Sequence, residues 1–175
     1  YLLGFPNSIE VPGFGQVAYG WLGTTVYVIW IVGLTNAFNF MDGMDGLAAG
    51  QAVVAGGFWF AAAWGAGLPL VAAIALLVAV GAAAFLPHNW SPARLFLGDI
   101  GSYFLGFSLA ALPLLALRAS SAPRPWLVAG ALMLAPFLFD TLFTIFRRLI
   151  ARENVFEAHR THLYQRLAAR GFSAP

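Results

Sequence analysis

The chain has 175 residues, of which 61% are hydrophobic and only 9% are charged. Soluble domains carry about 25% charged residues, so this composition excludes a soluble enzyme, a disordered segment and a nucleic-acid-binding domain. The formal net charge is +2, and the basic residues are all arginines, concentrated near the C-terminus. The absence of cysteine excludes a disulfide framework, a thiolate metal site and a catalytic thiol.

The chain is dominated by apolar runs whose length is close to the roughly 20 residues that a helix needs to cross a bilayer. The predicted spans are 21–38, 47–64, 68–86, 102–117 and 126–146. Only residues 65–67 separate the second span from the third, which predicts antiparallel neighbours. Residues 1–20 are rich in glycine and proline and are predicted to form turns or a short hairpin. The predicted fold is all-α, a polytopic transmembrane helix bundle with about five spans in one membrane-embedded domain, 1–175.

The loops between these spans alternate between the two sides of the membrane. Seven arginines fall in the loops 39–46 and 87–101 and in the tail from residue 147, against two in the opposite loops. The positive-inside rule places the arginine-rich side in the cytoplasm. Five of the seven acids and all three histidines share that side. Nearly all reactive side chains are therefore predicted to face the cytoplasm.

The first candidate site is the first motif, residues 36–48, which ends the first span. Asn36 and Asn39 are three residues apart and share a helical face, while Asp42 and Asp45 are each followed by glycine. A capped polar turn needs one Asp-Gly pair, not two pairs preceded by two amides. The pattern therefore favours a binding or catalytic role over a turn alone.

The second motif, residues 89–102, belongs to the longest loop on the same side. Asp99 stands between glycines just before the predicted fourth span. Carboxylate and amide oxygens are the ligands of hard cations, and Mg²⁺ usually completes its shell with water and substrate phosphates. A cap for the fourth span is the structural alternative, and the proximity of the first motif favours function.

The third motif, residues 159–165, lies in the basic C-terminal tail. His159 and His162 are three residues apart, and with Arg160 they could grip a pyrophosphate or a sugar hydroxyl. A basic segment touching anionic lipid explains the neighbouring arginines but not the histidines. A zinc site is disfavoured because cysteine and the His-Glu-x-x-His pattern are absent.

Asp140 lies inside the fifth predicted span, where an ionisable side chain is a functional candidate by default. A structural pairing with Arg147 is the alternative.

The three motifs together resemble the polyprenyl-phosphate N-acetylhexosamine-1-phosphate transferases. The matching patterns are Asn36-x-x-Asn39-Phe-x-Asp42-Gly-x-Asp45-Gly-Leu-Ala, Asn89-x-x-Pro92-Ala-Arg94-x-Phe96-x-Gly98-Asp99-x-Gly101-Ser102 and His159-Arg160-x-His162-Leu-Tyr-Gln. The third pattern resembles the lipopolysaccharide-initiating, O-antigen branch, since the consecutive histidine triplet typical of the peptidoglycan branch is absent. The resemblance implies a C-terminal half, because the family's N-terminal Asp-Asp motif and final span have no counterpart here.

The resemblance also implies a role for each motif. The metal ligands would be Asn39 and Asp99, holding Mg²⁺ with Mn²⁺ as a substitute. Asp45 would contact uracil and act with Asp42 and Asp99 in catalysis, and Asp42 would orient or deprotonate the acceptor phosphate. The remaining substrate-binding residues would be Asn36, Asn89, Arg94, His159, Arg160 and His162.

The implied reaction joins undecaprenyl phosphate to a UDP-N-acetylhexosamine and releases UMP at the cytoplasmic face of the bacterial inner membrane. The implied partners are these two substrates and the bilayer, with no nucleic acid and with a homodimer left open. The alternatives are an ion-coupled transporter, a peptidoglycan-branch phospho-muramoyl-pentapeptide transferase and a non-catalytic membrane scaffold. A transporter would need polar groups near the membrane midplane and inverted repeats, and the sequence places them at one interface without a repeat.

Overall fold

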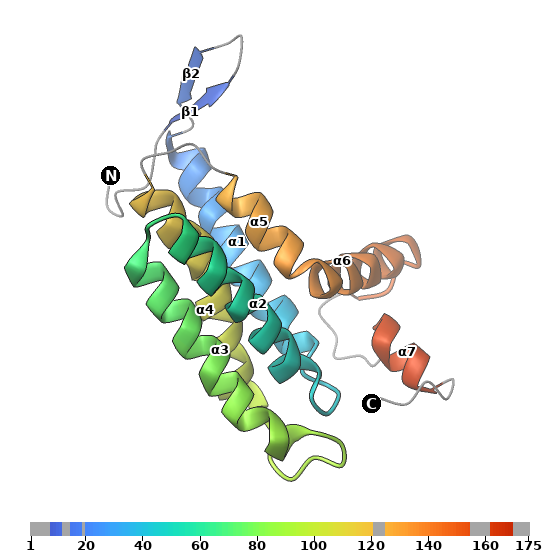
Figure 1. Cartoon of the computed structure of the whole chain (residues 1–175). Coiled ribbons are helices and arrows are strands. Elements are labelled where there is room, and N and C mark those ends of the chain that lie inside the picture. The colour runs from blue at the N-terminus through green and yellow to red at the C-terminus, as the bar shows by residue number, and fades with distance from the viewer. Residues whose placement is uncertain (1–7, 12–14, 19, 121–124, 155–161, 170–175) are drawn as a thin grey trace.

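Four long helices form the bundle of this computed structural model, which describes residues 8–11, 15–18, 20–120, 125–154 and 162–169 (Figure 1). They are α1 (Gly20–Phe40), α2 (Leu47–Gly65), α3 (Pro69–Asn89) and α4 (Gly98–Ala119). Each is long and apolar enough to cross a membrane, and a bent pair of helices raises the count to five within the described ranges. The predicted all-α, polytopic fold is confirmed.

A short antiparallel hairpin precedes α1, as predicted for the glycine-rich N-terminal residues. Strand β1 (Ser8–Val11) pairs with β2 (Gly15–Ala18), with Ser8 opposite Ala18 and Val11 opposite Gly15. The hairpin lies at one end of the bundle, and the α1–α2 and α3–α4 loops lie at the other end (Figure 1).

Helices α2 and α3 are antiparallel neighbours, as the short connection between them predicts. Gly67 has φ +72° in the turn, a left-handed conformation that favours glycine. A Cβ added at Gly56 would lie 3.0 Å from the carbonyl oxygen of Ala75 and from the Cβ of Ala79. Small residues thus let the two backbones approach closely, the usual mode of helix packing in lipid.

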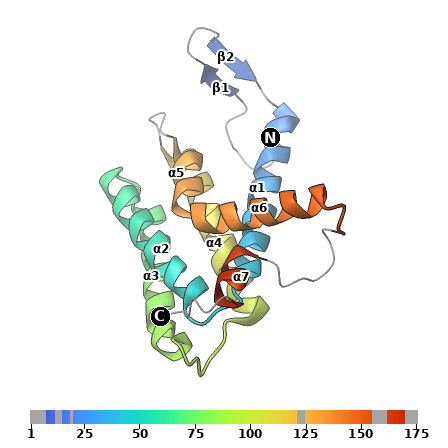
Figure 2. The ribbon, with the colours of Figure 1, turned by 90° about the vertical axis from the view of Figure 1, so that its right-hand side faces the viewer.

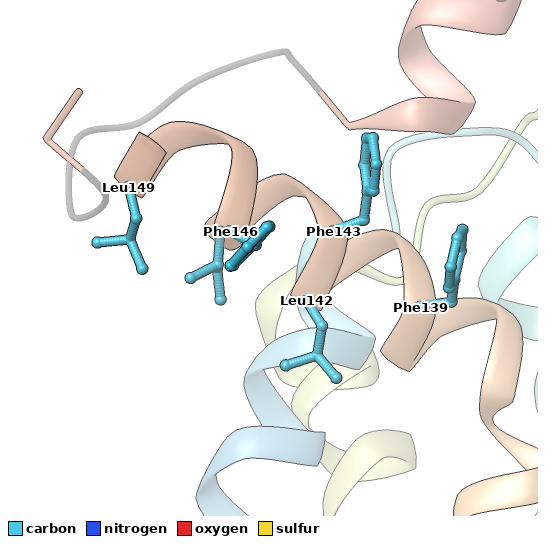
Figure 3. A pocket seen from close by; sticks show the side chains of 6 residues that line it. Phe139, Leu142, Phe143, Phe146 and Leu149 are labelled. Carbon is cyan, nitrogen blue, oxygen red and sulfur yellow. The ribbon is translucent and has the colours of Figure 1, made fainter. Parts of the chain in front are cut away.

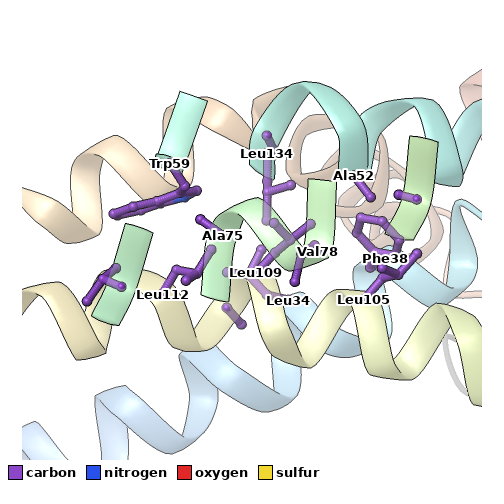
Figure 4. Packing of buried hydrophobic residues seen from close by; sticks show 14 of the residues in the cluster. Leu34, Phe38, Ala52, Trp59, Ala75, Val78, Leu105, Leu109, Leu112 and Leu134 are labelled. Carbon is purple, nitrogen blue, oxygen red and sulfur yellow. The ribbon is translucent and has the colours of Figure 1, made fainter. Parts of the chain in front are cut away.

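Buried apolar side chains from six helices form a single core (Figure 4). Phe38 of α1 lies beside Leu105 of α4, Leu34 of α1 lies beside Leu109, and the rings of Trp59 of α2 and Trp126 are tilted against each other with centroids 5.9 Å apart. The Trp30 indole donates a hydrogen bond of 2.9 Å to the Ala110 carbonyl oxygen and so joins α1 to α4. Large apolar side chains also cover much of the outer surface, which suits contact with lipid.

The fifth predicted span, 126–146, is not one continuous helix. It is divided into α5 (Trp126–Met133) and α6 (Ala135–Ile150), which are bent by 77°. Pro136 in the first turn of α6 has no N–H and cannot continue the hydrogen bonds of α5. The Gln51 side chain of α2 donates a 2.6 Å hydrogen bond to the Met133 carbonyl oxygen at this break. A side chain of α2 therefore satisfies a backbone carbonyl group that the break leaves without a helical partner.

Helix α6 runs across the bundle, and α7 (Leu163–Ala169) lies near the end that carries the α1–α2 loop (Figure 2). One face of α6 presents an open apolar hollow lined by Phe139, Leu142, Phe143, Ile145, Phe146 and Leu149 (Figure 3). The opposite face is polar and buried, and it holds Asp140 and Thr144.

Candidate active site

The first motif and the second motif meet at one end of the bundle. The Gly46 N–H donates a 3.1 Å hydrogen bond to the Asn89 side-chain oxygen, and the Ala93 N–H donates a 2.9 Å hydrogen bond to Asp45 Oδ2. The Asn89 amide in turn donates to the Leu95 carbonyl oxygen at 2.9 Å. The first two bonds fasten the end of α3 and the α3–α4 loop to the α1–α2 loop, and the third holds the α3–α4 loop against the end of α3.

Asn39 and Asp99 come together although 60 residues separate them in the chain. Asn39 Nδ2 lies 3.1 Å from Asp99 Oδ1 and 2.8 Å from Ser102 Oγ. The Ser102 hydroxyl also lies 2.8 Å from the Gly98 carbonyl oxygen, which fixes its position in the first turn of α4. The end of α1 and the start of α4 thus present an amide and a carboxylate side by side.

Asp42 stands next to this pair, on the loop that follows α1. Burial, and secondarily the negative charge of Asp99, raise the pKa of the Asp42 carboxyl to about 6. The carboxylates of Asp42 and Asp99 are close enough to repel each other, so a cation or a proton bound there would lower the electrostatic energy.

Hard oxygen ligands are available at Asn39 and Asp99, because an amide carries an oxygen acceptor as well as its N–H groups. Among the described residues no cluster of three or more His, Cys, Asp or Glu side chains forms a closed metal cage. Few protein ligands, with room for water and phosphate, match the coordination that Mg²⁺ prefers. These residues could therefore hold Mg²⁺ together with an anionic substrate.

Three predicted substrate-binding residues have different surroundings. Asn36 donates a 2.7 Å hydrogen bond to the Val32 carbonyl oxygen of its own helix. Asn89 is only 3% exposed, and both ends of its amide bond to the backbone, so the structure gives it a loop-fastening contact. Arg94 is exposed on the α3–α4 loop. Their roles toward a substrate remain predictions.

The third motif reaches the same end of the bundle through α7. The Tyr164 hydroxyl donates a 3.1 Å hydrogen bond to the Phe40 carbonyl oxygen, which joins α7 to the end of α1. The His162 ring is 4% exposed, and its centroid lies 6.0 Å from that of Phe40. His159 and Arg160 lie outside the described residues, so their predicted roles stay predictions.

The Asp140 carboxylate contacts His162, not the predicted alternative Arg147. Asp140 Oδ1 lies 2.8 Å from His162 Nδ1, and both side chains are buried. Arg147 Nε and Nη2 have no hydrogen-bond partner in the described part of the chain. The two partners are 22 positions apart, and sequence spacing predicts neighbours only within one helix, so this contact could not be predicted.

Gly43 and Tyr164 belong to the predicted motifs but were not among the predicted site residues. Gly43 packs against α7 so closely that an added Cβ would lie 2.0 Å from the Tyr164 hydroxyl oxygen. The only sequence signal for Gly43 was its place after Asp42 in the first motif. Tyr164 carried no separate signal beyond membership of the third motif.

Comparison with known proteins shows the family to which the chain belongs. The family model for glycosyl transferase family 4 matches residues 2–117, which include the first and second motifs. A Bacillus subtilis (strain 168) protein named "Probable undecaprenyl-phosphate N-acetylglucosaminyl 1-phosphate transferase" is 38% identical over 154 residues, covering 88% of this chain and 43% of that protein.

Two relatives carry the name phospho-N-acetylmuramoyl-pentapeptide-transferase. The one from Latilactobacillus sakei subsp. sakei (strain 23K) is 36% identical over 67% of this chain and 37% of its own length. The one from Synechococcus sp. (strain JA-3-3Ab) is 43% identical over 64% of this chain and 32% of its own length. The chain thus spans less than half the length of these relatives. With the family model covering both loop motifs, the chain belongs to glycosyl transferase family 4, the polyprenyl-phosphate sugar-1-phosphate transferases.

Proposed function

We propose that the full-length protein containing this chain transfers an N-acetylhexosamine-1-phosphate from a UDP-sugar to undecaprenyl phosphate. The acceptor phosphate attacks the phosphorus that carries the sugar, the diphosphate bond of the donor breaks, and UMP leaves with its electron pair. The observation that carries the proposal is the 3.1 Å contact between Asn39 and Asp99, at the end of the bundle that α7 also reaches. This end offers oxygen ligands for a cation that would neutralise an anionic donor, and a carboxyl that could exchange a proton.

Asn39 and Asp99 are proposed to hold Mg²⁺, for which Mn²⁺ can substitute because it accepts the same hard oxygen ligands. When bound, the ion neutralises the negative charge of the donor diphosphate, which is the main requirement of phosphoryl transfer.

Asp42 is proposed to orient the acceptor phosphate and to take its proton. A carboxyl whose pKa is raised to about 6 by burial exchanges a proton near neutral pH. Asp45 is proposed to contact uracil beside the α3–α4 loop that it holds. Asn36 supports the first motif from its place on α1.

The third motif is proposed to select the donor sugar. His159, Arg160 and His162 hold the pyrophosphate and the N-acetyl group, while Arg94 completes the donor site from the second motif and Asn89 supports it by holding the two loops together. The initiation of O-antigen-type polysaccharide is favoured over the peptidoglycan branch because the third motif lacks a histidine triplet. The N-acetylglucosaminyl relative also covers more of this chain than the two pentapeptide-transferases reported above.

The proposed location is the bacterial inner membrane, with the site facing the cytoplasm. The arginine-rich loops and the tail support this orientation. A nucleotide sugar is soluble and charged, so it approaches from water, while a polyprenyl tail stays in the bilayer.

A donor panel tests the proposal directly. The full-length protein in membranes is given undecaprenyl phosphate, Mg²⁺ and one of UDP-N-acetylglucosamine, UDP-N-acetylgalactosamine, UDP-N-acetylmuramoyl-pentapeptide or UDP-glucose. Acceptor-dependent UMP release with an N-acetylhexosamine donor is expected. Release with the pentapeptide donor alone would place the protein in the peptidoglycan branch. UDP in place of UMP would contradict sugar-1-phosphate transfer, and nucleotide binding without turnover would favour a transporter.

His162→Ala is expected to raise the KM for the UDP-sugar by up to about 10-fold while leaving the KM for undecaprenyl phosphate nearly unchanged, since one lost neutral hydrogen bond is worth roughly 0.5–1.5 kcal/mol. Initial rates measured against each substrate in turn give the two values. His88→Ala is the matched control, because His88 is exposed at the end of α3. Equal changes in both KM values would contradict a donor-specific role.

A further inference from the structure

The Asp140 carboxylate is a buried acceptor with four donors around it. His162 Nδ1 lies 2.8 Å from Oδ1, and the Thr144 hydroxyl donates to the same oxygen at 3.2 Å. The backbone N–H of Leu163 donates to Oδ1 and that of Tyr164 to Oδ2, both at 3.0 Å. Asp140 itself is only 5% exposed. A carboxylate desolvated to this degree is retained only where its oxygens are satisfied.

The contact with His162 determines where the imidazole proton sits. An ionised carboxylate only accepts hydrogen bonds, so the ring nitrogen facing it must be the donor. In the neutral ring the proton is then on Nδ1, and Nε2 carries the lone pair. A carboxylate that holds one ring nitrogen sets both the tautomer and the orientation of the ring.

The two backbone bonds fix the start of α7. The first N–H groups of a helix have no partner within the helix, and Asp140 accepts from two of them at Leu163 and Tyr164. The same carboxylate thus holds a side chain of the third motif and the helix that begins beside it.

The segment held by Asp140 touches the first motif. Tyr164 donates its hydroxyl proton to the Phe40 carbonyl oxygen, and Gly43 leaves room for that hydroxyl. The His162 ring is near the rings of both Phe40 and Tyr164, with centroid distances of 6.0 and 5.9 Å. Movement of α7 would therefore move the His162 ring relative to the end of α1, where Asn39 stands.

We propose that Asp140 is a positioning residue of the transferase site, which sets the tautomer of His162 and fastens α7 against the first motif. The proposal rests on the proposed function for the role of His162 in donor binding. Asp140 does not touch the substrate in this scheme. It acts through His162 and Tyr164, from a helix that the family model does not cover.

Asp140→Asn in the full-length protein tests the positioning role by kinetics. The variant keeps the shape but replaces one acceptor oxygen with a donor, so it cannot satisfy all four partners. The KM for the UDP-sugar is expected to rise about 10-fold, with a smaller change in the KM for undecaprenyl phosphate. Thr141→Val is the matched control, because the neighbouring Thr141 hydroxyl is buried without a hydrogen-bond partner in the described chain.

A double-mutant cycle shows whether Asp140 acts through His162. In a His162→Ala background, Asp140→Asn is expected to raise the donor KM far less than it does in the wild type, because the shared contact is already lost. Effects that multiply fully in the double variant would overturn the proposal.

Histidine ¹⁵N spectra of the wild type provide a readout that needs neither activity nor a stable Asp140 variant. The histidine signal missing from the spectrum of His162→Ala identifies His162. A ring protonated on Nδ1 is expected, and a ring protonated on Nε2 alone would overturn the proposal. If no donor supports UMP release, the proposed function fails, while these spectra still decide the positioning role. If the wild type is active and Asp140→Asn behaves like Thr141→Val, the positioning role alone is wrong.

Discussion

Replacement of Asp99 by alanine is expected to lower Mg²⁺-dependent UMP release by roughly 10³-fold, which corresponds to about 4 kcal/mol of lost transition-state stabilisation. Asp99 is the carboxylate that faces Asn39 at 3.1 Å, and its charge contributes to the raised pKa of Asp42. Removing it takes away the one charged member of the proposed ligand pair. Initial rates of UMP release over a range of Mg²⁺ concentrations give the measurement.

The neighbouring residue Ile100 provides the control for this variant. Its side chain is 90% exposed at the start of α4, so Ile100→Ala is expected to leave both turnover and Mg²⁺ dependence close to those of the wild type. Asp99→Asn separates charge from shape, and it is expected to lose nearly as much activity as the alanine variant. Wild-type UMP release by Asp99→Ala, at any Mg²⁺ concentration, would contradict the ligand assignment.

The helices were predictable because each depends on one local property. A run of apolar residues long enough to span a bilayer predicts α1 to α4 wherever the run is unbroken. The fifth run failed as a single helix because its break depends on Pro136 together with a partner, Gln51, that lies far away in sequence. Composition identifies an apolar segment, whereas the direction of that segment depends on tertiary contacts.

The candidate site was predictable where spacing within one motif carries the information. Residue types and glycine positions singled out Asn39, Asp42 and Asp99, and the structure brings all three to one end of the bundle. The Asp140–His162 contact could not be predicted in this way, because it joins α6 to the residue before α7, 22 positions further along the chain. Its two members stood out separately, one as a buried acid and the other as part of a histidine pair.

The close packing of α1 and α4 links the fold to the proposed metal site. Gly106 lies one turn after Ser102 on α4, and Ser102 is a hydrogen-bond partner of Asn39. A Cβ at Gly106 would lie 2.8 Å from the Phe38 Cβ and 3.1 Å from the Cα and carbonyl oxygen of Thr35. Because two of these atoms are backbone, the helices themselves must move to make room. The separation of α1 and α4 therefore controls the approach of Asn39 to Asp99.

Gly106→Ala is expected to destabilise the protein by about 1–3 kcal/mol, the usual cost of overpacking a filled interior, and Gly106→Leu by more. The Mg²⁺ concentration that gives half-maximal activity is expected to rise in both, because the proposed ligands move apart with the helices. Apparent melting temperatures in detergent and Mg²⁺ titrations of UMP release give the two measurements.

Gly33→Ala on α1 is the matched control for the Gly106 variants. Outside its own stretch of helix, no atom of the described residues lies within 4 Å of an added Cβ at Gly33, and alanine favours a helix over glycine by about 1 kcal/mol. This variant is expected to keep or raise the melting temperature, with an unchanged Mg²⁺ response. If Gly106→Ala lowered stability without changing the Mg²⁺ response, the packing of α1 on α4 would matter for folding but would not set the geometry of the proposed ligand pair. An unchanged melting temperature would contradict the close approach itself.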